Sequence, residues 1–139
     1  MGGTYAIVLA IPENTTVEVG ALGPITFSSG GYAYAGSALG SGGFSRVDRH
    51  RRVAAGDHDV RHWHIDYLLG TEGVTIESVI AVPEADVECA LARNLAGEPV
   101  PAFGASDCSC GSHLVHFDSV ASTQRVVVEA FLTIAPAGR

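Results

Sequence analysis

The sequence predicts a single α+β domain, and three observations support this prediction. Apolar, β-branched runs end at Pro12 and Pro83, as is typical of strands. Segments with helical spacing and helix-terminal residues lie between and after these runs. The chain has 139 residues, of which 47% are hydrophobic and 17% charged, which is enough for one core. No repeat or linker divides it, so we expect one domain over residues 1–139.

The predicted strands follow from short apolar runs bounded by turn residues. "GTYAIVLAI" is apolar and partly β-branched, and "VTIESVIAV" is the strongest strand pattern in the chain. "TTVEV" and "PITFSS" flank "GALG", which indicates a hairpin. The run "YAYAG" closes at Gly36. We therefore expect strands over 3–11, 15–19, 24–29, 32–36, 74–82 and 114–117.

The predicted helices have the spacing and the terminal residues that helices favour. "FSRVDRHRRV" has Ser41 or Ser45 available as an N-cap. In "PEADVECALARNLAG", Pro83 suits the first helical turn and Gly97 follows the end. "SVASTQRVVVEAFLTI" fits a helix or a strand, and we favour the helix. We therefore expect helices over 44–53, 65–69, 83–96 and 119–134.

The charges of this chain are unusual in kind and in placement. The net charge is -7, and all eight basic residues are arginine. Net negative charge keeps a protein soluble and is used by halophiles, so the composition indicates a salt-adapted host or a GC-rich genome. Most of the arginines nevertheless fall in one stretch: Arg46, Arg49, Arg51, Arg52 and Arg61. Such a concentration of arginine is expected of a protein that binds nucleic acid. The alternative is that these arginines form a solvated helix face.

The sequence also indicates where the protein resides. No apolar run reaches the length of about 18 residues that a membrane helix needs, so we expect no membrane partner. Three cysteines, an odd number, argue against a disulfide scaffold. We therefore expect a cytoplasmic protein with reduced thiols.

Four short motifs carry a resemblance to a known superfamily. "GTY" at 3–5, "YAG" at 34–36, "RVDRH" at 46–50 and a glutamate in a later helix resemble the GIY-YIG nucleases. More narrowly, the chain resembles a small uncharacterised prokaryotic and archaeal domain family within that superfamily, over about residues 2–118. This narrower resemblance rests on "YAGSA", "HWHIDYLL", "ECALA" and "FGASDCSCGSHL", in that order. It implies a small antiparallel central sheet flanked by helices, with the hairpin as an insertion.

The resemblance implies a metal-dependent endonuclease that hydrolyses phosphodiester bonds in DNA or RNA. Tyr5 and Tyr34 match the signature tyrosines, one of which helps to activate the attacking water. Arg46 matches the arginine that stabilises the phosphate. His50, four residues later on the same helical face, matches a position often filled by Tyr or His. We expect Arg46 and His50 to face the two tyrosines.

The resemblance also implies a divalent ion, Mg²⁺ or Mn²⁺, held by a helix carboxylate. Glu88 is the expected ligand, and Glu84, one helical turn earlier, is its competitor. A single carboxylate is chemically sufficient, because Mg²⁺ commonly binds one or two carboxylates plus substrate oxygens and waters.

The expected contacts to the substrate lie around the arginine-rich helix. Arginine forks suit phosphate oxygens, and glycine lets a backbone approach closely. We expect substrate contacts from Gly36, Ser37, Arg49, Arg52 and His64, with a nucleic acid as the partner and DNA favoured over RNA. Ser37 stands where many relatives carry a basic residue, so one positive charge is missing. This gap and the acidic net charge favour the alternative, a non-catalytic nucleic-acid-binding domain of the same fold.

A second group of residues has the side chains that zinc prefers. The group comprises Cys108, Cys110 and His113 in "DCSCGSH", with His62 and His64 in "HWHID". Alternate residues of an extended segment point the same way, so the last two could converge. Three interpretations stay open: a zinc site, which would stabilise the fold or serve another phosphorylated substrate; buried thiols beside a hydrogen-bonded histidine; or histidines that line the active cleft.

Overall fold

The computed structural model of the chain describes residues 3–37, 43–56, 64–83, 87–95, 97–100, 103 and 112–134. Its strands are β1 (Gly3–Ile11), β2 (Thr15–Glu18), β3 (Pro24–Phe27), β4 (Gly30–Ser37), β5 (Thr75–Pro83), β6 (Glu98–Pro99) and β7 (Leu114–Phe117). Its helices are α1 (Ser45–Ala54), α2 (His64–Leu69), α3 (Glu88–Asn94) and α4 (Val120–Ile134), with one 3₁₀ turn at Gly20–Leu22.

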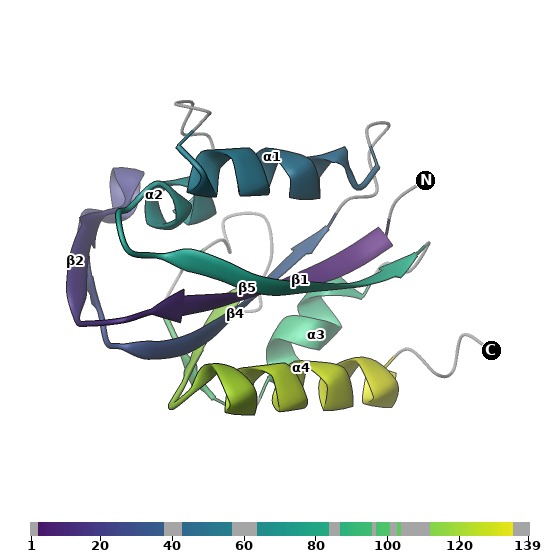
Figure 1. Cartoon of the computed structure of the whole chain (residues 1–139). Coiled ribbons are helices and arrows are strands. Elements are labelled where there is room, and N and C mark those ends of the chain that lie inside the picture. The colour runs from purple at the N-terminus through teal and green to yellow at the C-terminus, as the bar shows by residue number, and fades with distance from the viewer. Residues whose placement is uncertain are drawn as a thin grey trace.

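These elements form three layers around a central sheet. Five antiparallel strands take the order β5-β1-β4-β7-β6. Helices α1 and α2 cover one face of the sheet, and α3 and α4 cover the other (Figure 1). The two-stranded sheet β2-β3 is inserted between the central strands β1 and β4. The expected α+β fold with a flanked antiparallel sheet and an inserted hairpin is therefore confirmed.

Two details of the helix predictions need correction. Ser45 is the first residue of α1, whose N-cap is Phe44 with no side-chain capping bond, so Ser45 is not a cap. The other candidate cap, Ser41, lies outside the described residues. Pro83 ends β5 instead of opening a helix, and pairs with Gly3 of β1. A proline is tolerated there because β5 is an edge strand, on which a missing N–H can face away from the ladder.

The two faces of the sheet bury side chains of different size. On the α1 side lie large residues, because alternate residues of β1 and β4 point there. They are Tyr5, Ile7, Leu9, Ile11, Tyr32 and Tyr34. On the α4 side the same two strands present Ala6, Val8, Ala33 and Ala35. The small residues let α3 and α4 approach the sheet, while the larger ones fill the space beneath α1 and α2.

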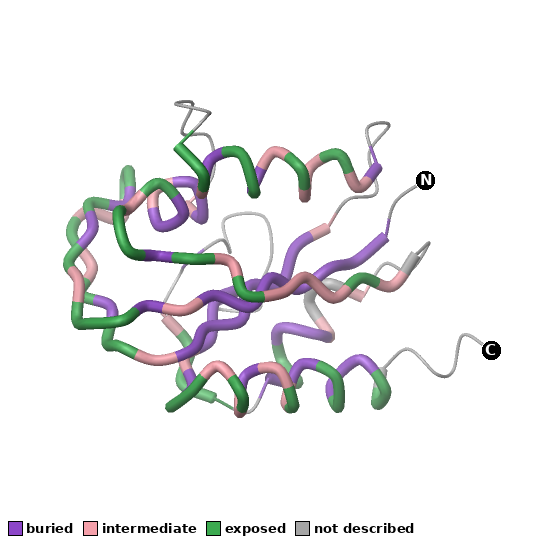
Figure 2. The backbone as a smooth tube through the Cα atoms, viewed as in Figure 1, coloured by how far each residue is buried: buried purple, intermediate pink, exposed green. Residues whose placement is uncertain are grey.

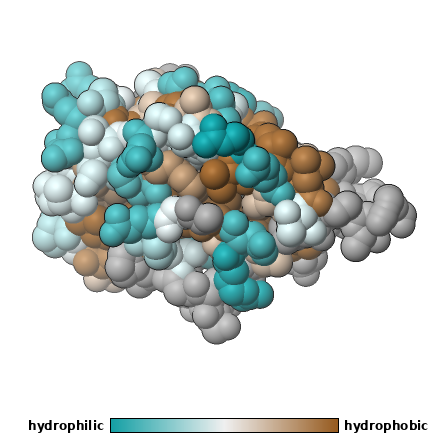
Figure 3. All heavy atoms as spheres, turned by 90° about the horizontal axis from the view of Figure 1, so that it is seen from below, coloured by the Kyte–Doolittle hydropathy of each residue, from teal (hydrophilic) through white to brown (hydrophobic). Residues whose placement is uncertain are grey.

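Burial follows these layers. The central strands are buried, whereas the outer sides of the helices are exposed (Figure 2). Two large apolar side chains of α4 are exposed to solvent, since Val128 is 45% and Leu132 66% exposed. From the side of α3 and α4, hydrophobic surface lies among hydrophilic residues (Figure 3). In the part of the chain that the structure describes, no helix combines the length and the apolar character needed to span a membrane.

Candidate active site

The signature tyrosines lie on neighbouring strands and on the same face of the sheet. Tyr5 pairs with Gly36 and Ile7 pairs with Tyr34 in the β1–β4 register. Residues that are paired or two apart share a face, so both tyrosines project toward α1. Tyr5 is 1% and Tyr34 8% exposed. The two motifs therefore pair on adjacent strands, and both side chains belong to the core.

His50 brings α1 into contact with both tyrosines. Its Nε2 atom lies 2.7 Å from the Tyr5 hydroxyl oxygen, in a buried hydrogen bond. Its ring centroid lies 6.2 Å from that of Tyr34, with the rings edge to face. His50 is 1% exposed. The expectation that His50 faces the tyrosines is therefore confirmed.

The environment of His50 keeps its ring neutral. Burial is the main cause, and it lowers the pKa of His50 to about 4. The charge of Asp66 acts in the opposite direction, whereas Arg49 and Arg46 lower the pKa further. At neutral pH a neutral imidazole has one nitrogen that accepts a hydrogen bond. His50 thus has the protonation state that a proton acceptor for Tyr5 requires.

This pKa predicts an acid-labile fold. The unfolded chain protonates His50 near its ordinary pKa of 6.5, whereas the folded chain does so at about 4. The unfolded state binds more protons between these values, so stability falls by about 3 kcal/mol as the pH drops through this window. Urea unfolding of wild type and His50→Gln from about pH 7 to about pH 4.5 isolates the effect. The difference between the two proteins should change with pH, and a constant difference would contradict the assignment.

Gly36 lies directly beneath the ring of Tyr5. A Cβ atom built on Gly36 would lie 2.4 Å from Cζ and 2.5 Å from the hydroxyl oxygen of Tyr5. No real Cβ makes such contacts, so a side chain here would displace the ring. The glycine of "YAG" therefore has a packing role, because it makes room for the tyrosine that contacts His50.

We expect Gly36→Ala to destabilise the protein by about 1–3 kcal/mol, since an extra methyl overpacks the core. It should also separate Tyr5 from His50, which the NMR signals of the His50 ring would report. Gly23→Ala is the control, because Gly23 has a positive φ of 76° but open space around it. That variant should lose stability through backbone strain and leave the His50 signals unchanged. Unchanged His50 signals in Gly36→Ala would contradict the packing role.

Arg46 connects α1 to the end of β4. Its Nη1 donates a hydrogen bond of 2.6 Å to the carbonyl oxygen of Ser37, and its side chain is partly buried. Ser37 pairs with Thr4, the neighbour of Tyr5. Arg46 therefore lies at the same end of the sheet as Tyr5 and Gly36, one helical turn before His50.

The other arginines of α1 have different surroundings. Arg49 forms a bidentate ion pair with Asp66 of α2, with both N···O distances 2.9 Å. Arg52 is exposed on the outer side of α1. Arg51 and Arg52 occupy the last turn, where positive charge also complements the helix dipole. The structure thus gives Arg49 a partner inside the protein and leaves Arg52 on the surface.

The backbone of Glu88 begins α3 near this end of the sheet. The N–H of Val87 donates a 3.0 Å hydrogen bond to the Thr4 hydroxyl, next to Tyr5. The helix itself packs on the face opposite α1. The side chain of Glu88 and the competitor Glu84 lie outside the described residues, so the metal carboxylate stays a prediction.

Tyr5, Tyr34 and His50 form a tyrosine cluster, and further aromatic contacts extend it toward α2. Phe103, which is fully buried, has its ring centroid 6.4 Å from Tyr34 and 5.6 Å from His64. Burial also lowers the pKa of His64. His64 therefore borders the tyrosine cluster through Phe103, and its side chain is partly exposed.

The zinc hypothesis falls mostly outside the described chain. His113 is buried next to β7, and its backbone N–H donates to the carbonyl of Phe103. His62, Cys108 and Cys110 lie outside the described residues. Among the residues that are described, no three His, Cys, Asp or Glu side chains form a group that could hold a metal ion. Zinc binding stays a prediction.

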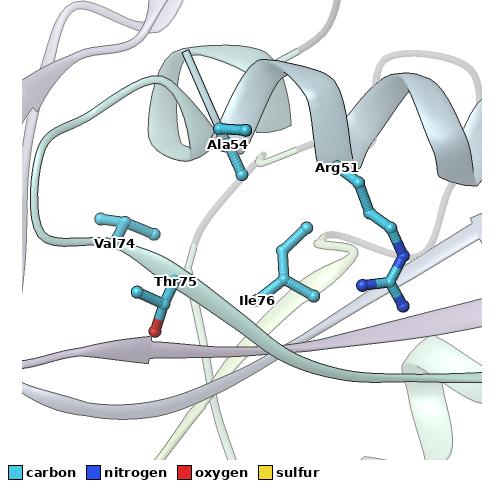
Figure 4. Close-up of a pocket in the computed structure, with 6 residues that line it drawn as sticks. Arg51, Ala54, Val74, Thr75 and Ile76 are labelled. Atoms are coloured by element: carbon cyan, nitrogen blue, oxygen red, sulfur yellow. The ribbon is translucent and has the colours of Figure 1, made fainter. Parts of the chain in front are cut away.

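A separate open pocket of about 250 Å³ lies between the end of α1 and the start of β5 (Figure 4). Its lining is Arg51, Ala54, Ala55, Val74, Thr75 and Ile76. Ile76 pairs with Leu9, whereas Tyr5 pairs with Ala81, five residues further along β5. At about 3.3 Å per residue the pocket lies roughly 15 Å from the tyrosine end of the sheet. It is therefore distinct from the tyrosine cluster.

Two residues that border the site, Asp66 and Phe103, are not among the residues that the sequence predicts for it. The position of Asp66 in the apolar stretch "IDYLL" was a usable signal, because a carboxylate among buried residues needs a partner. Phe103 gave no such signal, since an isolated aromatic residue in a Pro- and Gly-rich stretch has no periodicity.

The comparisons with known proteins add one finding. Residues 4–135 match the family described as domain of unknown function DUF123. No curated protein and no solved structure matches the chain.

Proposed function

Since this chain belongs to the family described as domain of unknown function DUF123, we propose its activity from the chemistry of the site: a metal-dependent endonuclease that hydrolyses phosphodiester bonds in nucleic acid, DNA in particular. The resemblance of "GTY", "YAG" and "RVDRH" to the GIY-YIG nucleases supports this proposal.

The observation that carries the proposal is the buried hydrogen bond between Tyr5 and His50. At the same end of the sheet, Arg46 contacts β4 through Ser37, and α3 begins beside Thr4 on the opposite face, with Glu88 as its first residue. Segments far apart in the sequence thus bring a phenol, a neutral imidazole and a guanidinium to one end of the sheet. These are the groups that proton transfer and phosphate binding require.

In the proposed reaction, a water molecule attacks phosphorus and its proton passes to the Tyr5 oxygen. The Tyr5 proton passes at the same time to Nε2 of His50, which is neutral at pH 7. The low pKa of His50 also makes it a weak base, which favours slow proton transfer. Arg46 stabilises the negative charge that develops on the phosphate. A Mg²⁺ or Mn²⁺ ion would stabilise charge on the leaving oxygen. Glu88, which begins α3 at this end of the sheet, would hold the ion, and one carboxylate with water and phosphate oxygens is a donor set that suits it.

The burial of the pair adds a requirement. Tyr5 and His50 are each 1% exposed, so a phosphodiester reaches them only after this end of the sheet opens. Opening of a segment before chemistry is common in enzymes and limits the turnover of many of them. We therefore expect slow cleavage.

The same burial favours a second candidate function. A non-catalytic nucleic-acid-binding domain would keep Tyr5 and His50 as packing residues and would bind through exposed arginines. Arg51 and Arg52 at the end of α1 are exposed and suit this role. The two candidates differ in whether binding leads to cleavage.

The decisive experiment incubates the purified protein with labelled single-stranded, duplex and branched DNA and with RNA. We expect cleavage with Mg²⁺ or Mn²⁺ and none with EDTA. Binding is measured in parallel, and it should weaken steeply as salt rises if phosphates are contacted. Binding with every substrate intact after long incubation with Mn²⁺ would favour the second candidate. If the protein neither binds nor cleaves, both proposals are wrong.

A further inference from the structure

Asp66 is a fully buried carboxylate that forms an ion pair with the guanidinium of Arg49. Both of its oxygens accept hydrogen bonds from the Arg49 guanidinium, at 2.9 Å each. Asp66 is 0% exposed, and the Arg49 side chain is 14% exposed. The two residues belong to α2 and α1, so the pair fixes one helix against the other.

The energetics of such a pair point to a role other than stability. Taking two charges out of water costs free energy that their attraction often only offsets. A well-packed hydrophobic pair of similar volume is frequently as stable or more so. A bidentate fork, in contrast, fixes the relative orientation of its two partners more strictly than apolar packing does. The Arg49–Asp66 pair is therefore better suited to orienting α1 than to stabilising the fold.

The residue that follows Arg49 is His50. A rotation of α1 about its axis would move His50 out of reach of the Tyr5 hydroxyl, because their hydrogen bond is 2.7 Å long. Such a rotation would also move Arg46 away from the Ser37 carbonyl. The ion pair stands on the side of α1 that meets α2 and opposes this movement.

We propose that Asp66, acting through Arg49, is a positioning residue of the site, which holds α1 in the rotation that keeps His50 on Tyr5. The consequence for cleavage rests on the proposed function, whereas the consequence for the His50–Tyr5 contact does not. Asp66 is fully buried, so it acts without touching the substrate.

The test replaces the pair without leaving a buried charge behind, in the double variant Arg49→Met/Asp66→Leu. Two-dimensional NMR reports the contacts between the His50 and Tyr5 rings and the pKa of His50, and kinetics report kcat and KM. We expect a folded protein with weakened ring contacts, and a kcat at least about tenfold lower with KM changed less than about twofold. Thr71→Val, which removes a hydrogen bond to the Tyr67 carbonyl at the end of α2, is the control. It should leave both measurements unchanged.

A second variant covers the case in which the double variant does not fold. Arg49→Lys keeps the charge but loses the fork, so it should fold and show a smaller loss of ring contacts. Intact ring contacts and unchanged kcat in a folded variant without the pair would overturn the proposal. If wild type cleaves nothing, the proposed function fails, and the ring contacts alone then decide the positioning role.

Discussion

Glu88→Ala is expected to abolish cleavage while the fold stays intact. The reason is that Glu88 is the proposed charged ligand of the metal ion, and such an ion contributes several kcal/mol of charge stabilisation. Several kcal/mol correspond to a loss of rate of about a thousandfold or more. The cost in stability is small, because an acidic residue at the first turn of a helix contributes about 0.3–1 kcal/mol through the helix dipole. Single-turnover cleavage with Mn²⁺ and urea unfolding measure the two quantities.

Two further variants make this prediction specific. Glu129→Ala removes an exposed glutamate from α4 and should leave cleavage unchanged. Glu84→Ala tests the competing carboxylate. If Glu84→Ala abolishes cleavage and Glu88→Ala does not, the metal ligand is Glu84. If both variants cleave as fast as wild type, neither carboxylate has a role in the proposed mechanism.

Tyr5→Phe is expected to lower kcat by a factor of about 10² to 10⁴, the range typical of a lost acid–base group. The substitution removes the hydroxyl that bonds His50 and keeps the ring that packs over Gly36. Stability should fall by about 1–3 kcal/mol, because the buried Nε2 of His50 loses this hydrogen bond. Rapid-quench cleavage and urea unfolding report the two effects separately.

Tyr32→Phe is a closely matched control for this experiment. Tyr32 lies on the same face of the sheet, is 1% exposed and donates its hydroxyl to the Ser28 carbonyl at 2.7 Å. Its loss should lower stability by a comparable amount without changing kcat. If both variants lose activity in proportion to stability, Tyr5 has only a packing role.

Much of the fold was predictable because strand and helix periods are local properties of the sequence. The runs at 3–11 and 74–82 and the helix at 119–134 are long and regular, and each is close to its observed bounds. The strand β6 was not predicted, since it has two residues, one of them proline, and is defined only by its pairing with β7. The position of Pro83 was misjudged, because its tolerance in β5 depends on the edge of a sheet that no local pattern shows.

Those residues of the site that belong to the short motifs were predictable from the sequence. Tyr5, Tyr34 and His50 came from the order of short motifs, and the structure brings them together. The pairing of Arg49 with Asp66 was not predictable from local spacing. The two residues are 17 positions apart, on helices whose docking decides which charges meet.

The packing of Tyr5, Gly36 and His50 into one buried unit also predicts how the family diverges. Every lineage is under selection to keep these residues, whatever its activity, because core substitutions destabilise the fold. The exposed Arg52 has no such constraint, since surface substitutions usually change stability by less than about 0.5 kcal/mol. Under the proposed function, arginine at this position should drift to neutral residues in relatives that do not bind nucleic acid, while the buried unit persists. Under this proposal the fold alone maintains the buried unit, whereas binding maintains the exposed arginines.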